Sequence, residues 1–311
     1  MAHIAARGGR QKRWSAGAVG ARVGFGRWAL VLGIGPAVVL FLIFLGFPIL
    51  ESIHLSFSQW GGVGAATGVG LQNYSNLIRS GALWHTLLLT AQFAGITAAG
   101  IMVTATLLAA AMNAKVWGAT AYRFVWFLPV IAPAPAAGVF WSLAWQPGGA
   151  ANALLGALGL GNQHALLAQN STALYPPILA GVWAGTGLAF LLVLGSMRTI
   201  PTDVYEAAKM DGASATRQFF TITLPLIRPV LVTTTMLEVI WNANGFTLLW
   251  AMTQGGPGFS TSVLAVYVYR EAFTFSEFGL ANAAAVLGGA ALVVFGLVML
   301  RASKSQRDAA A

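Results

Sequence analysis

The chain contains no cysteine, and charged residues make up only 8% of its 311 positions. The absence of cysteine excludes disulfides, zinc–thiolate sites and thiol catalysis. The scarcity of charge excludes an ordinary soluble domain, in which about a quarter of residues are charged. Hydrophobic residues instead account for 57% of the chain. This composition predicts an all-α integral membrane protein.

The sequence also lacks the motifs of several catalytic classes. It has no G-x-x-x-x-G-K-[ST] loop, so we expect no nucleotide site on this chain. The glycine-rich run 255–258 follows an apolar segment and is interpreted as a turn or as a contact with an external protein, not as a phosphate site. His54, His85 and His164 have no second ligand at metal spacing, and no nucleophile stands beside a base. We therefore predict no catalytic residue and no metal site, which disfavours an intramembrane enzyme.

Apolar runs long enough to cross a membrane occur six times. A span needs about 20 mostly apolar residues. Pro129, Pro133 and Pro135 predict a kinked third span, while Pro225 and Pro229 mark the entry to the fifth. The first run is longer than the roughly 7–15 apolar residues of a signal peptide and lacks an A-x-A site, so we expect it to stay uncleaved. The six expected spans are 28–50, 83–112, 124–145, 173–197, 226–250 and 279–300.

The basic residues predict the orientation. In a six-span topology, every Lys and Arg except Arg79 and Arg270 falls on the same side of the membrane. The positive-inside rule makes that side cytoplasmic, with both termini on it. The net charge of +9 is thus explained by topology and anionic lipid, and we expect no nucleic-acid partner. The predicted organisation is a disordered basic arm (1–27), a transmembrane domain (28–301) and a short cytoplasmic tail (302–311).

A charged insert, residues 198–228, interrupts the apolar pattern. It holds seven of the 25 charged residues, which are costly in hydrocarbon, so it must leave the membrane. Asp203 with Glu206 three residues later predicts a helix start, and Gly212 predicts a left-handed helix end. Ser214 can cap a second short helix. Two helices joined at a glycine bend fit either a groove on a partner or the membrane interface.

The insert also carries a recognisable motif. The string Glu206-Ala207-Ala208-x-x-Asp211-Gly212-Ala213 resembles the EAA signature of permeases of binding-protein-dependent ABC importers. Its spacing is similar to that of the carbohydrate branch, which includes the maltose and glycerol-phosphate permeases. Similar family positions continue along almost the whole chain after the arm, at Pro48, Ser56-Phe57, Gly70-Leu71-x-Asn73-Tyr74, Trp141, Pro147-Gly148, Gly255-Gly256-Pro257, Tyr267-x-Tyr269 and Ala272-Phe273.

The resemblance implies a set of partners rather than a reaction. Such permeases pair with a second permease, rest on two ABC ATPase subunits that use ATP and Mg, and receive solute from an extracytoplasmic binding protein. They are multi-pass proteins of the bacterial inner membrane, bathed in lipid, and bind no cofactor themselves. The insert is then an EAA coupling loop that docks on an ATPase. The coupling residues carried over are Asp203, Glu206, Ala207, Ala208, Asp211 and Gly212.

A polar stripe in the fifth expected span is the candidate solute pathway. Glu238 is the acidic residue well inside a span, and Trp241, Asn242 and Gly245 follow on the same helical face. A carboxylate, an amide and an indole can bind sugar through hydrogen bonds and stacking. The resemblance also places sugar contacts on this span. Pairing of Glu238 with a second permease is the alternative.

Other polar positions complete the candidates. Asn244 matches a recurrent family asparagine but lies off the stripe, and Thr247 stands where many relatives carry Asp. Gln92 and Asn282 could line a pathway or bond neighbouring helices. We predict import of a mono- or oligosaccharide by alternating access. The alternatives are a glycerol-phosphate or polyol permease of the same family, or an ion-gradient secondary transporter, for which no clear inverted repeat is present.

Overall fold

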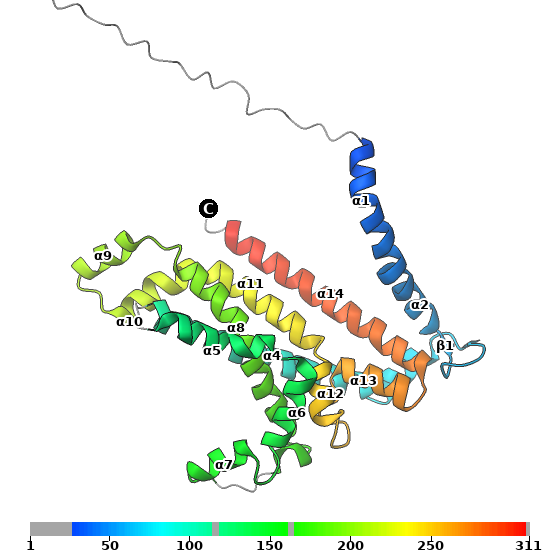
Figure 1. The fold of residues 1–311 in the computed structure, drawn as a ribbon. Coiled ribbons are helices and arrows are strands. Elements are labelled where there is room, and N and C mark those ends of the chain that lie inside the picture. Colours follow the sequence, from blue (N-terminus) through cyan, green and yellow to red (C-terminus); the bar gives the residue numbers. More distant parts are fainter. Residues whose placement is uncertain (1–26, 114–117, 161–164, 309–311) are drawn as a thin grey trace, which may run out of the picture. The chain divides into compact units, whose positions relative to one another are not determined.

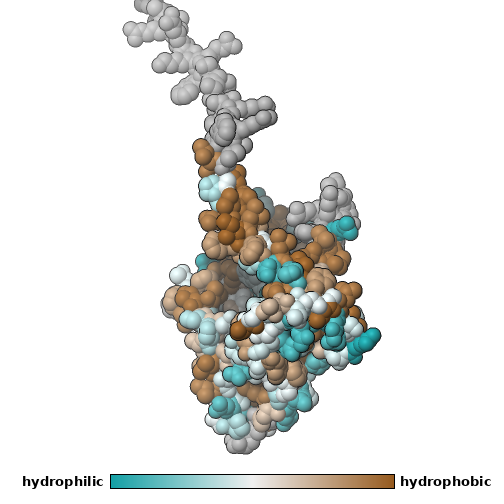
Figure 2. Space-filling view, turned by 90° about the vertical axis from the view of Figure 1, so that its right-hand side faces the viewer, coloured by the Kyte–Doolittle hydropathy of each residue, from teal (hydrophilic) through white to brown (hydrophobic). Residues whose placement is uncertain are grey.

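The computed structural model describes residues 27–113, 118–160 and 165–308. The expected basic arm up to residue 26 and His164 lie outside the described residues. The chain divides into two compact units, Met1–Leu50 and Glu51–Ala311. The first unit contains α1 (Arg27–Phe41), a π turn (η1, Leu42–Gly46) and the first residues of α2 (Phe47–Leu55). Apolar side chains cover this helix (Figure 2), and the run Leu32–Leu55 is long enough to span a membrane, as predicted for the first span.

The second unit is almost entirely helical (Figure 1). Its one sheet in the described residues is a two-stranded antiparallel pair, with Ser58 opposite Gly68. The elements in chain order are β1 (Ser58–Gln59), β2 (Thr67–Gly68), α3 (Gln72–Arg79), α4 (Ala82–Asn113), α5 (Ala119–Ile131), α6 (Ala134–Ala144), α7 (Ala150–Ala157), η2 (Leu166–Ala168), α8 (Tyr175–Met197), α9 (Thr202–Met210), α10 (Ala215–Gln218), η3 (Phe219–Thr223), α11 (Leu224–Ala243), α12 (Thr247–Thr253), α13 (Leu264–Tyr269), η4 (Arg270–Thr274) and α14 (Phe278–Asp308).

Five helices in the described chain have the length and hydropathy of membrane spans, and a sixth span is formed if the bent pair α5–α6 counts as one. This confirms the helical multi-span fold. The two halves of the bent pair meet at 98°, because Pro133 follows Ala132 in extended conformation and begins a new helix. The kink expected from the prolines is therefore confirmed.

The expected fifth span, 226–250, is wrong at its end. Helix α11 stops at Ala243, and Asn244 caps it by donating from Nδ2 to the Ile240 carbonyl oxygen at 2.9 Å. Gly245 follows, with its backbone so close to the Asn242 carbonyl oxygen that an added Cβ would lie 2.9 Å from it. A short separate helix, α12, then covers the remainder of the expected span.

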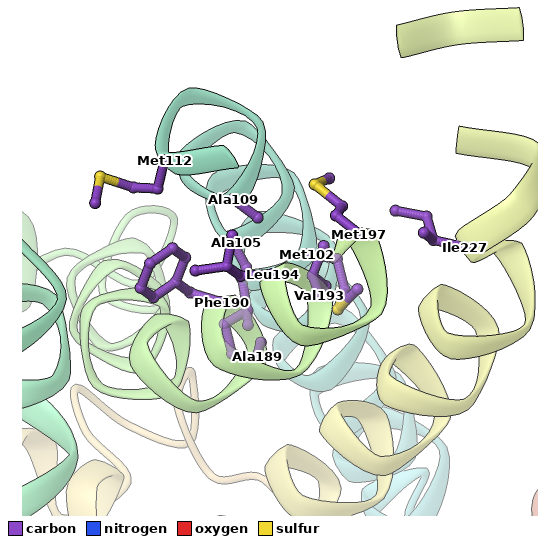
Figure 3. Close-up of a cluster of buried hydrophobic side chains, with 11 residues drawn as sticks. Met102, Ala105, Ala109, Met112, Ala189, Phe190, Val193, Leu194, Met197 and Ile227 are labelled. Atoms are coloured by element: carbon purple, nitrogen blue, oxygen red, sulfur yellow. The ribbon is translucent and has the colours of Figure 1, made fainter. Parts of the chain in front are cut away.

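Small side chains allow the central helices of the second unit to pack closely. Helix α8 packs along α4, and α11 packs against both. Their shared core holds alanines from α4 and α8 beside larger side chains such as Phe190 and Met197 (Figure 3). Gly181 and Gly185 face α4 so closely that an added Cβ would collide with Thr97 and Ile101. Such small-residue contacts are typical of helix pairs in membranes, where close packing replaces the hydrophobic effect.

Candidate functional site

The charged insert folds as predicted at its glycine bend and differs at its start. Gly212 has φ +77°, and the amide of Ala213 donates to the Ala208 carbonyl oxygen at 2.9 Å, which is a Schellman ending. The predicted cap at Asp203 is wrong. Pro201 occupies the cap position without a side-chain bond, and Asp203 lies in the first turn of α9. A carboxylate is still favourable there because the turn's free N–H groups carry positive partial charge.

Helix α9 has one packed face and one free face. On the packed face, the Tyr205 hydroxyl lies 2.9 Å from the Thr223 hydroxyl at the base of α11. Asp203, Glu206, Ala207 and Met210 lie on the other face at i, i+3, i+4 and i+7 spacing, and all are exposed; Met210 is exposed to 89%. Ala208 is half-buried, and Asp211 and Gly212 are exposed at the bend. The structure thus gathers most of the predicted coupling residues on one accessible surface.

The second short helix is not separate from the following span. Ser214 caps α10, as predicted, by accepting from the Arg217 amide at 3.3 Å. A π turn, η3, then leads directly into α11, so that 215–243 form one continuous helix. Pro225 lies in the first turn of α11, at the entry to this span as predicted, and it does not separate α11 from the turn before it. The wider π turn lies immediately before the proline, where a regular turn would bring the ring against the preceding carbonyls.

A cavity of about 320 Å³ lies between α4, α5–α6, α8, α11 and α12, and it includes most of the predicted solute stripe. Glu238, Trp241 and Asn242 all line it. The Glu238 side chain is 4% exposed, and Asn242 Nδ2 lies 2.8 Å from its carbonyl oxygen and 3.4 Å from its Oε2. Trp241 is 56% exposed. The structure therefore joins a carboxylate, an amide and an indole in one cavity, as the stripe predicted.

Two predicted members of the pathway lie elsewhere. Asn244 is exposed at the helix end and is not among the residues lining the cavity. Gly245 lies beyond the end of α11, so it does not continue the stripe. The extra length assigned to the fifth span explains the difference at Gly245, whereas Asn244 was already expected off the stripe.

Sequence reasoning missed several residues that shape this cavity. Gly181 and Gly185 form one wall, and Pro129, Ala132 and Ala134 line it where α5 breaks into α6. Irregular backbone at membrane depth is tolerated where it borders a cavity. Two signals could have found them: the Gly-x-x-x-Gly spacing on α8 and the cluster of prolines in the third span.

The remaining polar candidates either bond a neighbouring side chain or are exposed. Asn282 accepts from the Ser52 hydroxyl at 2.6 Å, which is a bond between helices, and Gln92 is exposed. His54 lies 3.8 Å from the Glu51 carboxylate with both side chains exposed. Within the part of the chain that the structure describes, no three His, Asp or Glu residues gather as a metal site would require.

Comparison with known proteins identifies the architecture. Residues 101–305 match the model of the family described as binding-protein-dependent transport system inner membrane component. The chain belongs to this family. It is the multi-pass inner-membrane permease subunit of an ABC importer, a membrane component and not the catalytic subunit.

The match between this permease and individual relatives extends over nearly the full length of those proteins. The probable ABC transporter permease protein YurN of Bacillus subtilis is 30% identical over 88% of this chain and 95% of its own. The trehalose/maltose transport system permease protein MalF of Thermococcus litoralis is 26% identical over 89% of this chain and 94% of its own. A solved bacterial ABC transporter for the acidic polysaccharide alginate has a similar fold, with a TM-score of 0.76 at 22% identity over 89% of this chain and 96% of that one.

Proposed function

We propose that this permease imports a neutral mono- or oligosaccharide by alternating access, using a solute-binding protein outside the membrane and two ATPases inside it. A second permease subunit completes the pathway. ATP and Mg²⁺ bind to the ATPases, and this chain supplies the passage. Relatives named for trehalose/maltose and for multiple sugars support the substrate class.

The observation that carries the substrate class is the chemistry of the central cavity. Its lining includes a nearly buried carboxylate, an amide and an indole, and no Lys or Arg is among the described residues that line it. Hydroxyl groups of a sugar can donate to the Glu238 carboxylate, and a sugar face can stack on Trp241. A phosphate or uronate would meet like charge at Glu238, so a neutral solute is favoured over glycerol phosphate and over an acidic polysaccharide.

Substitution of Glu238 tests the pathway. Glu238→Gln keeps hydrogen-bonding capacity and should lower ATP-driven uptake into proteoliposomes by about tenfold, the value of one charge-assisted hydrogen bond. Glu238→Leu should abolish uptake while leaving complex assembly intact. Gln92→Leu, which removes an exposed amide from α4, serves as the matched control. Uptake by Glu238→Leu at the wild-type rate would show that this cavity is not part of the solute pathway.

The free face of α9 supports the proposed contact with an ATPase. Under the positive-inside orientation this face lies in the cytoplasm. Its two carboxylates and two small or apolar side chains suit a cleft with basic groups and apolar walls. Met210 is the strongest apolar anchor, because a large apolar side chain this exposed in the isolated chain gains most from being covered.

Charge reversal on this face tests the coupling. Glu206→Lys or Gly212→Asp should uncouple ATP hydrolysis from uptake, while the variant still inserts and co-purifies with the second permease. Thr216→Lys places the same new charge on the neighbouring helix α10 and should transport normally. Normal coupled uptake in both α9 variants would contradict the assignment.

A further inference from the structure

A second cavity, of about 510 Å³, lies where α4 and α14 begin, at the opposite end of these helices from the charged insert. Its walls come from α3, the first turn of α4, α13 with its π turn, and the start of α14. These walls are mostly apolar, and their polar side chains are Asn76, Ser80, His85, Thr86, Tyr267 and Glu271. The proposed solute pathway does not use this cavity.

The cavity contains a buried carboxylate, Glu271, that is not part of an ion pair within the described residues. Glu271 is only 8% exposed, and burial raises its pKa, which a hydrogen bond from Tyr267 and the charge of Arg270 oppose. Arg270 is engaged elsewhere: its Nη1 donates to the Gly258 carbonyl oxygen at 2.9 Å, and its guanidinium lies 4.3 Å from the centre of the Phe259 ring. Over the described residues, no ion pair includes Glu271.

An ionised carboxylate that is buried without an ion pair is energetically unfavourable, and one that lines an open cavity can be neutralised by a cationic group that enters it. A lysine or arginine side chain satisfies the geometry, because its several N–H donors need several acceptors. The cavity offers the carboxylate together with an amide and hydroxyl oxygens from three other elements. A free Ca²⁺ ion would require six to eight oxygen ligands around one point, whereas these oxygens are spread over the cavity walls.

We infer that this cavity receives a basic side chain of the extracytoplasmic solute-binding protein when that protein docks on the permease. The inference rests on the proposed function, since the orientation proposed there places the cavity outside the membrane. The docked cation offsets the free-energy cost of ionising the buried Glu271, so the carboxylate determines where the binding protein docks. Charged contacts of this kind contribute to the specificity and speed of association.

The first test measures the charge preference of the cavity without any partner. Because the chain has no cysteine, Ser80→Cys introduces a single thiol on the cavity wall. The thiol should react faster with a cationic methanethiosulfonate (ethylammonium) than with the anionic sulfonatoethyl reagent. Adding Glu271→Gln should lower that rate ratio by about tenfold, as expected for the loss of one nearby charge at a partly buried site. Glu51→Gln removes an exposed carboxylate that is not among the residues lining the cavity and is the matched control.

The second test identifies the occupant. In a complex whose other subunits carry no accessible cysteine, the solute-loaded binding protein that stimulates this importer should protect the thiol of the Ser80→Cys variant from the cationic reagent. Protection should be lost with Glu271→Gln at binding-protein concentrations that protect the parent variant. Ser80→Lys, which supplies a cation from within the chain, should weaken binding-protein stimulation of the ATPase more than the size-matched Ser80→Met.

The outcomes separate the inference from the proposed function. A binding protein that stimulates the ATPase but leaves the introduced thiol unprotected overturns the docking inference and leaves the proposed function standing. A thiol already protected before the binding protein is added assigns the cavity to another subunit and overturns the inference. Absence of any stimulation in the wild-type complex overturns the proposed function. An unchanged rate ratio in Glu271→Gln, with the variant monodisperse and assembled, shows that the carboxylate does not govern the cavity and overturns the inference.

Discussion

The glycine bend of the insert offers the sharpest test of how α9 is held. Gly212 has φ +77°, a conformation that costs an L-residue about 1–2 kcal/mol. No atom lies within 4 Å of the position that an added Cβ would take, so Gly212→Ala introduces conformational strain without a collision in the isolated chain. The substitution should therefore destabilise the Schellman ending by that amount and leave the spans intact.

Hydrogen exchange measures this effect directly. The amide of Ala213 donates to the Ala208 carbonyl oxygen at 2.9 Å and reports on the closed turn. A cost of about 1–2 kcal/mol should increase its exchange rate by about 5- to 30-fold. Gly64→Ala is the matched control, since Gly64 also has a left-handed φ, +79°, and open space around its Cβ position. Unchanged exchange at Ala213 in Gly212→Ala would refute the view that this glycine maintains the turn.

A third variant separates strain from contact. Asparagine tolerates the left-handed conformation better than alanine but is larger. If Gly212 serves conformation alone, coupled transport should rank Gly above Asn above Ala. If the ATPase approaches this bend closely, Asn should be the poorest of the three, because its side chain occupies the space that the partner needs. Equal transport by all three would mean that neither role limits coupling.

Two further substitutions test the packing around these sites. Tyr205→Phe removes the hydroxyl pair with Thr223 and should loosen α9 by about 1 kcal/mol, seen as faster protease cleavage in the insert; unchanged cleavage would show that the bond does not secure α9. Gly279→Ala places a Cβ against the Ser58 carbonyl oxygen and should lower the melting temperature of the purified protein. Gly289→Ala, with nothing within 4 Å of its Cβ, is the control, and similar melting of the two variants would count against the collision.

The fold could be predicted largely because lipid imposes simple rules. Apolar run length located the spans, and Pro133 located the bend in the third. The end of α11 was missed because hydropathy continues through Asn244 and Gly245 into α12, while the helix stops for reasons of local hydrogen bonding and backbone approach. Helical periodicity brought Glu238 and Asn242 together correctly, since both lie on one uninterrupted helix.

The rest of each site depends on contacts between distant segments. The glycine wall of the central cavity and the proline break that borders it come from different helices, and one sequence does not show which helices meet. The same holds for Glu271, whose cavity is closed by α3 and α4, about 190 residues earlier in the chain. Burial of that carboxylate could not be inferred from its neighbours in the π turn η4.

The π turn at Phe219–Thr223 has a mechanical consequence. Thr223 and Glu238 lie on the same continuous helix, about 22 Å apart at 1.5 Å per residue. A π turn holds one residue more than an α turn, so its conversion to regular helix would rotate one half of this rod against the other by about 100°. Thr223, to which Tyr205 of α9 is bonded, is the last residue of that turn. A displacement of α9 would therefore act on the π turn of this helix. Rotation at that turn would reorient the Glu238 carboxylate about the helix axis without bending the helix.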